Sequence, residues 1–99
     1  MKKIVLLCSA GMSTGMLVKK MEEAAAEMGY EADIHAWPVA EAERVTKDAD
    51  IVLLGPQIRF QLNRMKGIAS CPVEAIDMTA YGLMNGEKVM KRVKEVLGE

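Results

Sequence analysis

Apolar residues form two short, unbroken runs in this chain, one at residues 4–7 and one within residues 50–55. A run of this length that ends in small or turn-forming residues is typical of a parallel strand covered on both faces. Residues 31–37 alternate polar and apolar positions in part, which predicts a more exposed strand that Pro38 ends. A fourth strand is predicted over residues 72–77.

Between the strands the apolar spacing changes to three and four residues, which predicts helices. The first helix starts near Thr14 and stops at Gly29, a residue that favours a helix end. Its expected inner face consists of Met16, Leu17, Met21, Ala24, Ala25 and Met28.

Three further helices follow from the same spacing. A short helix over residues 39–47 is expected to turn these residues inward: Ala40, Val45 and Ala42. A turn at Pro56, Gln57 and Ile58 leads into a helix that carries the apolar residues Phe60, Leu62, Met65 and Ile68. After a loop over residues 78–86, the last helix presents Val89, Met90, Val93, Val96 and Leu97 on one side.

Strands alternate with helices along the whole chain, without a linker, repeat or low-complexity tract. This order predicts an α/β fold: a four-stranded parallel sheet with right-handed crossovers and helices on both faces. We expect a three-layer sandwich of the flavodoxin-like or phosphatase-like kind, with a P-loop-like loop after the first strand. Because 99 residues fall at the lower end of domain size, residues 1–99 are expected to form a single domain.

Composition and charge exclude several classes of function. With 51% hydrophobic and 27% charged residues the chain is an ordinary globular one, and a net charge of −1 leaves no broad basic surface for nucleic acid. No segment is long enough to cross a bilayer. The apolar run after Lys2 and Lys3 ends at Cys8 and Ser9, too early for a signal peptide, so direct membrane insertion is not expected.

The cysteines are Cys8 and Cys71, and neither belongs to a CxxC pair or a cluster with histidine. Zinc or thioredoxin-like chemistry is therefore not expected, and the sequence implies no metal or other cofactor. Two lone thiols indicate a reducing compartment, so a cytoplasmic protein is expected.

The loop after the first strand is the expected site, because ligands of such sheets bind beyond the carboxyl ends of the strands. It has no charged side chain, and its small residues let backbone N–H groups converge at a helix start, which makes an anion cradle. Ser13 or Thr14 is expected to cap the helix, and either hydroxyl can donate to a phosphate oxygen. The predicted phosphate-binding residues are Ser9, Ala10, Gly11, Met12, Ser13, Thr14 and Gly15.

Cys8 is the first residue of this loop, so its sulfur is expected to face the amides, which favour the thiolate over the thiol. The simpler interpretation is a small buried hydrophobe at a strand end. A cysteine-dependent phosphatase carries an Arg six residues after its nucleophile, where this chain has Thr14. With no acid evident beside the loop either, hydrolysis is poorly served, and a phosphocysteine should persist until an acceptor arrives.

Three stretches of the chain resemble one known family. Residues 4–14, with the run Cys-Ser-Ala-Gly-Met-Ser-Thr, resemble the active-site loop of the IIB components of the bacterial phosphoenolpyruvate-dependent sugar phosphotransferase system, lactose/cellobiose (chitobiose) type. Residues 50–58 resemble the third strand and following turn of that family. Residues 72–77, with Tyr81 and Gly82, resemble its fourth strand and loop.

The resemblance implies that Cys8 accepts a phosphoryl group from a phosphohistidine of a IIA partner. It implies that Cys8 then donates the group to a sugar held by a membrane-embedded IIC partner, which would largely set the sugar. The loop amides of residues 10–14 would bind the phosphate. Gly15 departs from the family pattern, which has a hydroxyl residue there, so a capping or phosphate-binding hydroxyl is missing and the first turn is expected to be looser.

A few residues outside the loop are candidates for partner docking: Gln57, Ile58, Tyr81 and Met12. For Gln57 and Ile58 the alternative is a simple turn into a helix, and for Tyr81 it is a surface tyrosine packed on its own loop. His35 is interpreted as a partly exposed structural residue. Cys71 precedes a strand at the edge of the sheet opposite the loop, and is expected to be inert.

Two other functions remain open at this point. One is a low-molecular-weight cysteine phosphatase or an arsenate-reductase-like enzyme on the same fold. The other is a non-catalytic regulatory domain whose loop binds an anion or a partner while Cys8 stays unreactive.

Overall fold

The computed structural model describes residues 1–9 and 12–99 of the chain. Its sheet has four parallel strands in the order β2-β1-β3-β4. The strands are β1 (Lys2–Cys8), β2 (Ala32–Pro38), β3 (Ile51–Leu54) and β4 (Val73–Ala75). The predicted α/β fold is thereby confirmed. The strand order reverses between β1 and β3, and in such sheets the ligand crevice lies outside the carboxyl ends of those two strands.

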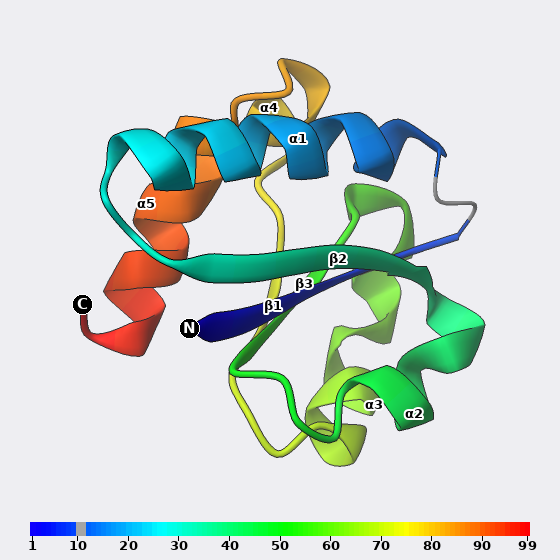
Figure 1. Ribbon diagram of the computed structural model, residues 1–99. Coiled ribbons are helices and arrows are strands. Elements are labelled where there is room, and N and C mark those ends of the chain that lie inside the picture. Colours follow the sequence, from blue (N-terminus) through cyan, green and yellow to red (C-terminus); the bar gives the residue numbers. More distant parts are fainter. Residues whose placement is uncertain (10–11) are drawn as a thin grey trace.

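Helices cover both faces of the sheet and make three layers (Figure 1). The helices on one face are α1 (Met12–Glu27), α4 (Met78–Gly82) and α5 (Gly86–Leu97). The other face is covered by the 3₁₀ turn η1 (Val39–Glu41), α2 (Ala42–Val45), the 3₁₀ segment η2 (Pro56–Gln61) and α3 (Leu62–Ile68).

The alternation of the buried strands explains the two cores. Because successive side chains point to opposite faces, Ile4 and Leu6 of β1 pack under α1 and α5, whereas Val5 and Leu7 pack against α2 and α3. Strand β3 divides in the same way, since Ile51 and Leu53 join the first core and Val52 and Leu54 the second. All eight side chains of these two runs are buried, as the unbroken apolar pattern predicted.

The short helical segments depart from the predicted periodicity. In place of one helix over residues 39–47 the chain forms η1 and then α2, and Ala40 is exposed although it was expected to face inward. A 3₁₀ turn brings positions three apart onto one side, so the inward residues are Val39, Ala42 and Val45.

Two other apolar residues were wrongly placed in the core. Phe60 is 78% exposed, because η2 is a 3₁₀ segment with non-helical dihedrals at Ile58 (φ −119°, ψ 21°), which put Ile58 inside instead. Met16 is 61% exposed, because the neighbouring residues Leu17 and Met21, four apart on α1, already fill the inner side of the helix.

The predicted loop over residues 78–86 contains the helix α4, which is a correction. Asp77 caps this helix, since its carboxylate accepts a hydrogen bond from the N–H of Ala80 at 3.0 Å. Met84 then takes a positive φ of 52°, and Asn85 caps α5 through the N–H of Lys88 at 3.1 Å. The chain therefore changes direction between two capped helices.

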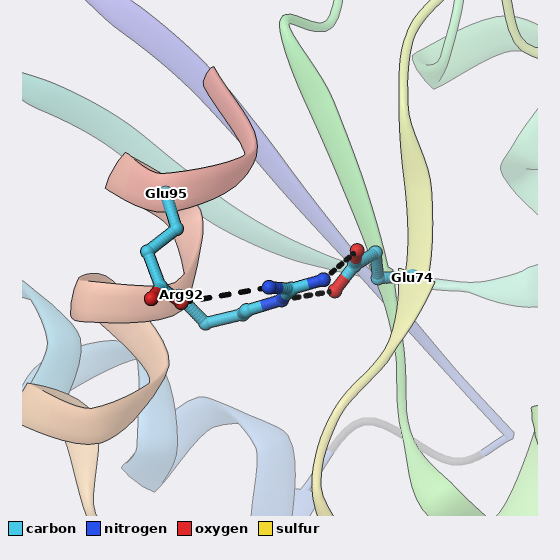
Figure 2. A network of polar contacts seen from close by, with 3 residues as sticks. All are labelled: Glu74, Arg92 and Glu95. Carbon is cyan, nitrogen blue, oxygen red and sulfur yellow. Dashed lines mark hydrogen bonds and ion pairs between the residues drawn. The ribbon is translucent and has the colours of Figure 1, made fainter. Parts of the chain in front are cut away.

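The edge strand β4 is tied to α5 by a polar network (Figure 2). Arg92 donates two hydrogen bonds to the carboxylate of Glu74, at 2.8 and 2.7 Å, and a longer one to Glu95 at 3.5 Å. The bidentate geometry fixes the guanidinium beside the strand. Charged groups at this edge disfavour pairing with a further strand.

In the described ranges, no helix has the length and apolar character needed to span a membrane.

Candidate functional site

Cys8 is the last residue of β1 and lies at the reversal point of the sheet, where the crevice was predicted. The residue is 3% exposed. Its Sγ donates a weak hydrogen bond to the main-chain carbonyl of Trp37, at 3.7 Å, on the neighbouring strand β2. This contact needs the thiol proton, so it belongs to the neutral, unmodified side chain.

The end of β3 lies directly beside Cys8. The N–H of Gly55 donates to the carbonyl of Leu7 at 2.9 Å, which continues the pairing of the two strands to the first residue after β3. A Cβ atom on Gly55 would lie 3.1 Å from Oε1 of Gln57 and 3.9 Å from Cβ of Cys8. The missing side chain therefore leaves room for the Gln57 amide next to the cysteine.

The predicted phosphate-binding residues are described only in part. Ser9 is exposed at the start of the loop, whereas Ala10 and Gly11 lie outside the described residues, as do the side chains of Met12 and Ser13. The backbone of α1 begins at Met12. The first N–H groups of any helix have no partner within it, and such a helix end suits an anion.

Thr14 and Gly15 belong to the first turn of α1 and differ in their surroundings. Gly15 is exposed, and a Cβ atom added to it would have nothing within 4 Å. The Thr14 side chain is 1% exposed, and its Oγ1 lies 3.3 Å from the hydroxyl of Tyr81. This contact joins residues 67 apart in sequence, and nothing in the local pattern indicates it.

Tyr81 belongs to α4 and is 8% exposed, so the interpretation as a surface tyrosine packed on a loop is wrong. Its ring packs in the core under α1, and its accessible edge lines a shallow cavity with Pro56, Gln57, Met78 and Gly82. The helix could have been predicted from Asp77, a preferred N-cap residue, directly before the segment.

Ile58 is not available for docking, because its side chain is 3% exposed and packs in the core with Val5 and Leu7. Gln57 remains exposed at the cavity. Four large apolar side chains are exposed on α1, η2, α4 and the turn after α4, although two of them, Met16 and Phe60, were predicted to face inward. We call these residues the apolar rim: Met16, Phe60, Met78 and Leu83.

The carboxylate of Asp77, shortly after β4, already has two partners. Asp77 has a lowered pKa, because the Ala80 N–H donates to its carboxylate and, more weakly, because the ammonium of Lys88 lies 3.5 Å away. A carboxylate held in this way stays ionised at neutral pH. It is therefore not a proton donor for a leaving group.

Cys71 and His35 lie away from this end of the sheet. Cys71 is half-buried just before β4, and burial together with the carboxylate of Asp50 raises the pKa of its thiol, which makes it a weak nucleophile at neutral pH. His35 is exposed on β2, with Nε2 2.8 Å from the Asp33 carboxylate, as expected for a surface histidine. Over the described part of the chain, no group of three potential ligands is arranged for a metal ion.

The fold and site together define a class of protein: a parallel α/β domain that presents a cysteine at the end of β1, beside the loop that leads to its first helix. The chain belongs to the family described as "PTS system, Lactose/Cellobiose specific IIB subunit", whose profile matches residues 3–92. It is thus a IIB component of a sugar phosphotransferase system, as the resemblance implied.

Three relatives illustrate the match. The chain is 42% identical over 100 residues to the oligo-beta-mannoside-specific EIIB component of Bacillus subtilis (98% of this chain, 97% of the relative). It is 38% identical over 104 residues to the galactose-specific EIIB component of Lactococcus lactis subsp. cremoris (97% and 96%). The solution structure of the cellobiose-specific IIB protein from Borrelia burgdorferi superposes with a TM-score of 0.79 at 38% identity (98% and 92%).

Proposed function

We propose that this protein is a phosphoryl carrier that takes a phosphoryl group onto the sulfur of Cys8 and passes it to a sugar. The observation that carries the proposal is the position of Cys8 at the carboxyl end of β1, beside the helix start of α1 and the switch point of the sheet. Family membership supports the same assignment, because the relatives are sugar-specific components of phosphotransferase systems.

The chemistry has two displacements at phosphorus. In the first, the Cys8 sulfur attacks the phosphorus of a phosphohistidine on a IIA protein, the P–N bond breaks as the P–S bond forms, and the thiol proton ends on the released imidazole nitrogen. In the second, a sugar hydroxyl attacks the phosphorus, the P–S bond breaks, and the hydroxyl proton is returned to the thiolate or to water. The Trp37 carbonyl contact must be released first, since a modified sulfur has no proton to donate.

Two features favour transfer to a sugar over hydrolysis by water. The position six residues after Cys8 is Thr14, so no guanidinium clamps the phosphoryl group there. Asp77 is committed to capping α4 and to Lys88, so it does not serve as the acid of a phosphatase. The phosphocysteine is therefore expected to outlast a phosphatase intermediate.

The apolar rim supports docking of a protein donor. Its members Met16, Phe60, Met78 and Leu83 are 60 to 78% exposed and belong to segments at the carboxyl end of the sheet. Large apolar side chains exposed on the segments that follow β1, β3 and β4 favour contact with a protein surface. We assign this surface to the IIA donor, in place of the docking role predicted for Ile58.

The sugar is expected to be held by a membrane IIC protein, which receives the phosphoryl group. The named relatives differ in sugar, from oligo-beta-mannoside to galactose, although they match nearly the whole chain. This spread supports a specificity set outside the carrier. Two free thiols, Cys8 and Cys71, favour action in the cytoplasm.

The test compares the two cysteines. A ³²P-labelled phosphohistidine IIA protein of the lactose/cellobiose type is mixed with wild type, Cys8→Ser and Cys71→Ser, and label on each carrier is counted. Wild type and Cys71→Ser are expected to take up one equivalent in an acid-labile thiophosphate linkage. Cys8→Ser is expected to take up none of this product.

Label on His35, or on Cys8→Ser at the wild-type level, would contradict the proposal. Steady turnover of p-nitrophenyl phosphate by the wild type would instead favour a phosphatase. If neither the wild type nor Cys71→Ser takes up label, a non-catalytic regulatory domain is favoured.

A further inference from the structure

A pair of buried hydroxyl groups connects α4 to the first turn of α1. Thr14 is 1% exposed and Tyr81 is 8% exposed, and the oxygens of their hydroxyls are 3.3 Å apart. Each hydroxyl can donate one hydrogen bond and accept others, so either can serve as donor in this contact. Thr14 belongs to α1, the helix that the Cys8 loop enters, and Tyr81 belongs to α4, which follows β4.

Tyr81 is rigidly held at its own end. Its N–H donates to the carbonyl of Asp77 at 2.9 Å, and its carbonyl accepts from the N–H of Met84 at 3.1 Å. Tyr81 belongs to the same buried core as Leu17, which lies one turn after Thr14 on α1. The phenol oxygen thus lies beside the first turn of α1.

A threonine in a helix has two accessible side-chain rotamers, because its hydroxyl can also bond to a carbonyl of the preceding turn. In the structure, Oγ1 of Thr14 lies toward the phenol oxygen on α4. When Tyr81 donates, the hydroxyl proton of Thr14 is left free for a further acceptor. Thr14 occupies the position where a phosphatase would use an arginine, so its orientation determines what this turn offers to a phosphoryl group.

We propose that Tyr81 is a positioning residue for phosphoryl transfer, which acts by holding the Thr14 side chain in place in the first turn of α1, the helix that the Cys8 loop enters. The inference rests on the proposed carrier function and adds a residue to it. Tyr81 touches neither the sulfur nor the phosphoryl group in this role. Its contribution is made entirely through Thr14.

The experiment measures transfer from the ³²P-labelled phosphohistidine IIA protein to Cys8 over a range of donor concentrations. The variants are Tyr81→Phe, Thr14→Val, Thr14→Ser and the double variant of Tyr81→Phe with Thr14→Val. Tyr30→Phe is the matched control, since it also removes a phenol hydrogen bond, to Glu99 at 2.8 Å, but at the other end of the sheet. Unfolding of each variant is followed in urea, so that the rates are compared among folded proteins.

Tyr81→Phe is expected to lower the rate at saturating donor about tenfold, with the half-saturating donor concentration unchanged. Thr14→Val should lose at least as much, and the double variant no more than Thr14→Val alone, because both changes disable the same hydroxyl. Thr14→Ser, which keeps the hydroxyl, should retain most of the rate. Tyr30→Phe should match the wild type.

A rate for Tyr81→Phe equal to that of Tyr30→Phe would overturn the inference, and so would losses that multiply in the double variant. Should Tyr81→Phe unfold, the comparison of Thr14→Val with Thr14→Ser still decides, since equal rates would show that no hydroxyl is needed. A wild type that takes up no label would overturn the carrier function itself. A wild type that is labelled on Cys8 while all variants match it would overturn only the role of Tyr81.

Discussion

At the carboxyl end of the sheet the polar groups that the structure describes beside Cys8 are uncharged, whereas at the amino end β1 carries ion pairs through Lys2 and Lys3. The Cys8 sulfur contacts the Trp37 carbonyl, and the buried pair in the next helix consists of the hydroxyls of Thr14 and Tyr81. At the amino end, Lys3 pairs with Asp48 at 2.6 Å. The difference indicates that the immediate surroundings of Cys8 are suited to a charge that arrives with a partner.

The two thiols illustrate the same contrast. Cys71 is close to the carboxylate of Asp50, and burial and this charge raise the pKa of its thiol. Tyr30 at the same end has its pKa raised to about 12, by burial and by its bond to Glu99. A phosphoryl dianion on Cys71 would be repelled by the Asp50 carboxylate, so Cys71 is poorly suited to carry it.

The largest effect on stability is expected at Gly86, where α5 begins against the middle of α1. This residue begins α5, and a Cβ there would run into the main chain of Lys20 and Met21 on α1. Because backbone cannot move aside like a flexible side chain, Gly86→Ala should lower the free energy of unfolding by about 3 kcal/mol, measured by urea denaturation. Gly82→Ala is the control, since nothing lies within 4 Å of its Cβ position.

A loss for Gly86→Ala no larger than that for Gly82→Ala would show that α1 and α5 separate readily. The carboxyl end would then be the looser of the two ends, and a fixed Thr14–Tyr81 contact would be hard to maintain.

The sequence was sufficient for the parts of this arrangement that follow from local periodicity. Residues 4–7 and 51–54 are buried on both faces, and Cys8 lies at the carboxyl end of the first strand, because unbroken apolar runs joined by helices pack as parallel strands covered on both sides. Met21, Met65 and Met90 fill core positions as their spacing predicted.

The sequence failed where geometry is set by short segments or by distant partners. Ala40 and Phe60 were misplaced because 3₁₀ turns change the period from about 3.6 to 3.0 residues. The helix α4 has only five residues, too few for a periodic signal, although Asp77 marks its start. The Thr14–Tyr81 contact and the Trp37 carbonyl beside Cys8 depend on tertiary packing, so no local pattern could indicate them.

A smaller effect, on binding of the IIA donor, is expected at the apolar rim, where Phe60 is 78% exposed. Phe60→Ala should raise the half-saturating concentration of the phosphorylated IIA donor about tenfold, because an exposed aromatic ring is a common anchor of a protein interface. The free energy of unfolding should change by less than about 0.5 kcal/mol, since the ring contributes little to the core.

His35→Ala provides the comparison, because His35 is also an exposed ring but lies on β2 away from the rim. If the half-saturating donor concentration is the same for Phe60→Ala and His35→Ala, the docking surface lies elsewhere. An effect of His35→Ala alone would move it to the β2 side of the molecule.

The smallest effect concerns two helical glycines near opposite ends of the sheet, Gly15 in α1 and Gly67 in α3. Both lie within helices, and neither has an atom within 4 Å of its Cβ position. Replacement by alanine removes the entropy cost of glycine in a helix, so each variant should gain roughly 0.5 to 1 kcal/mol in the free energy of unfolding, measured in urea. If Gly67→Ala gains and Gly15→Ala does not, the first turn of α1 is not held in a helical conformation before phosphorylation. The carboxyl end of the sheet would then be the more mobile end, and the orientation of Thr14 would be established only when the phosphoryl group arrives.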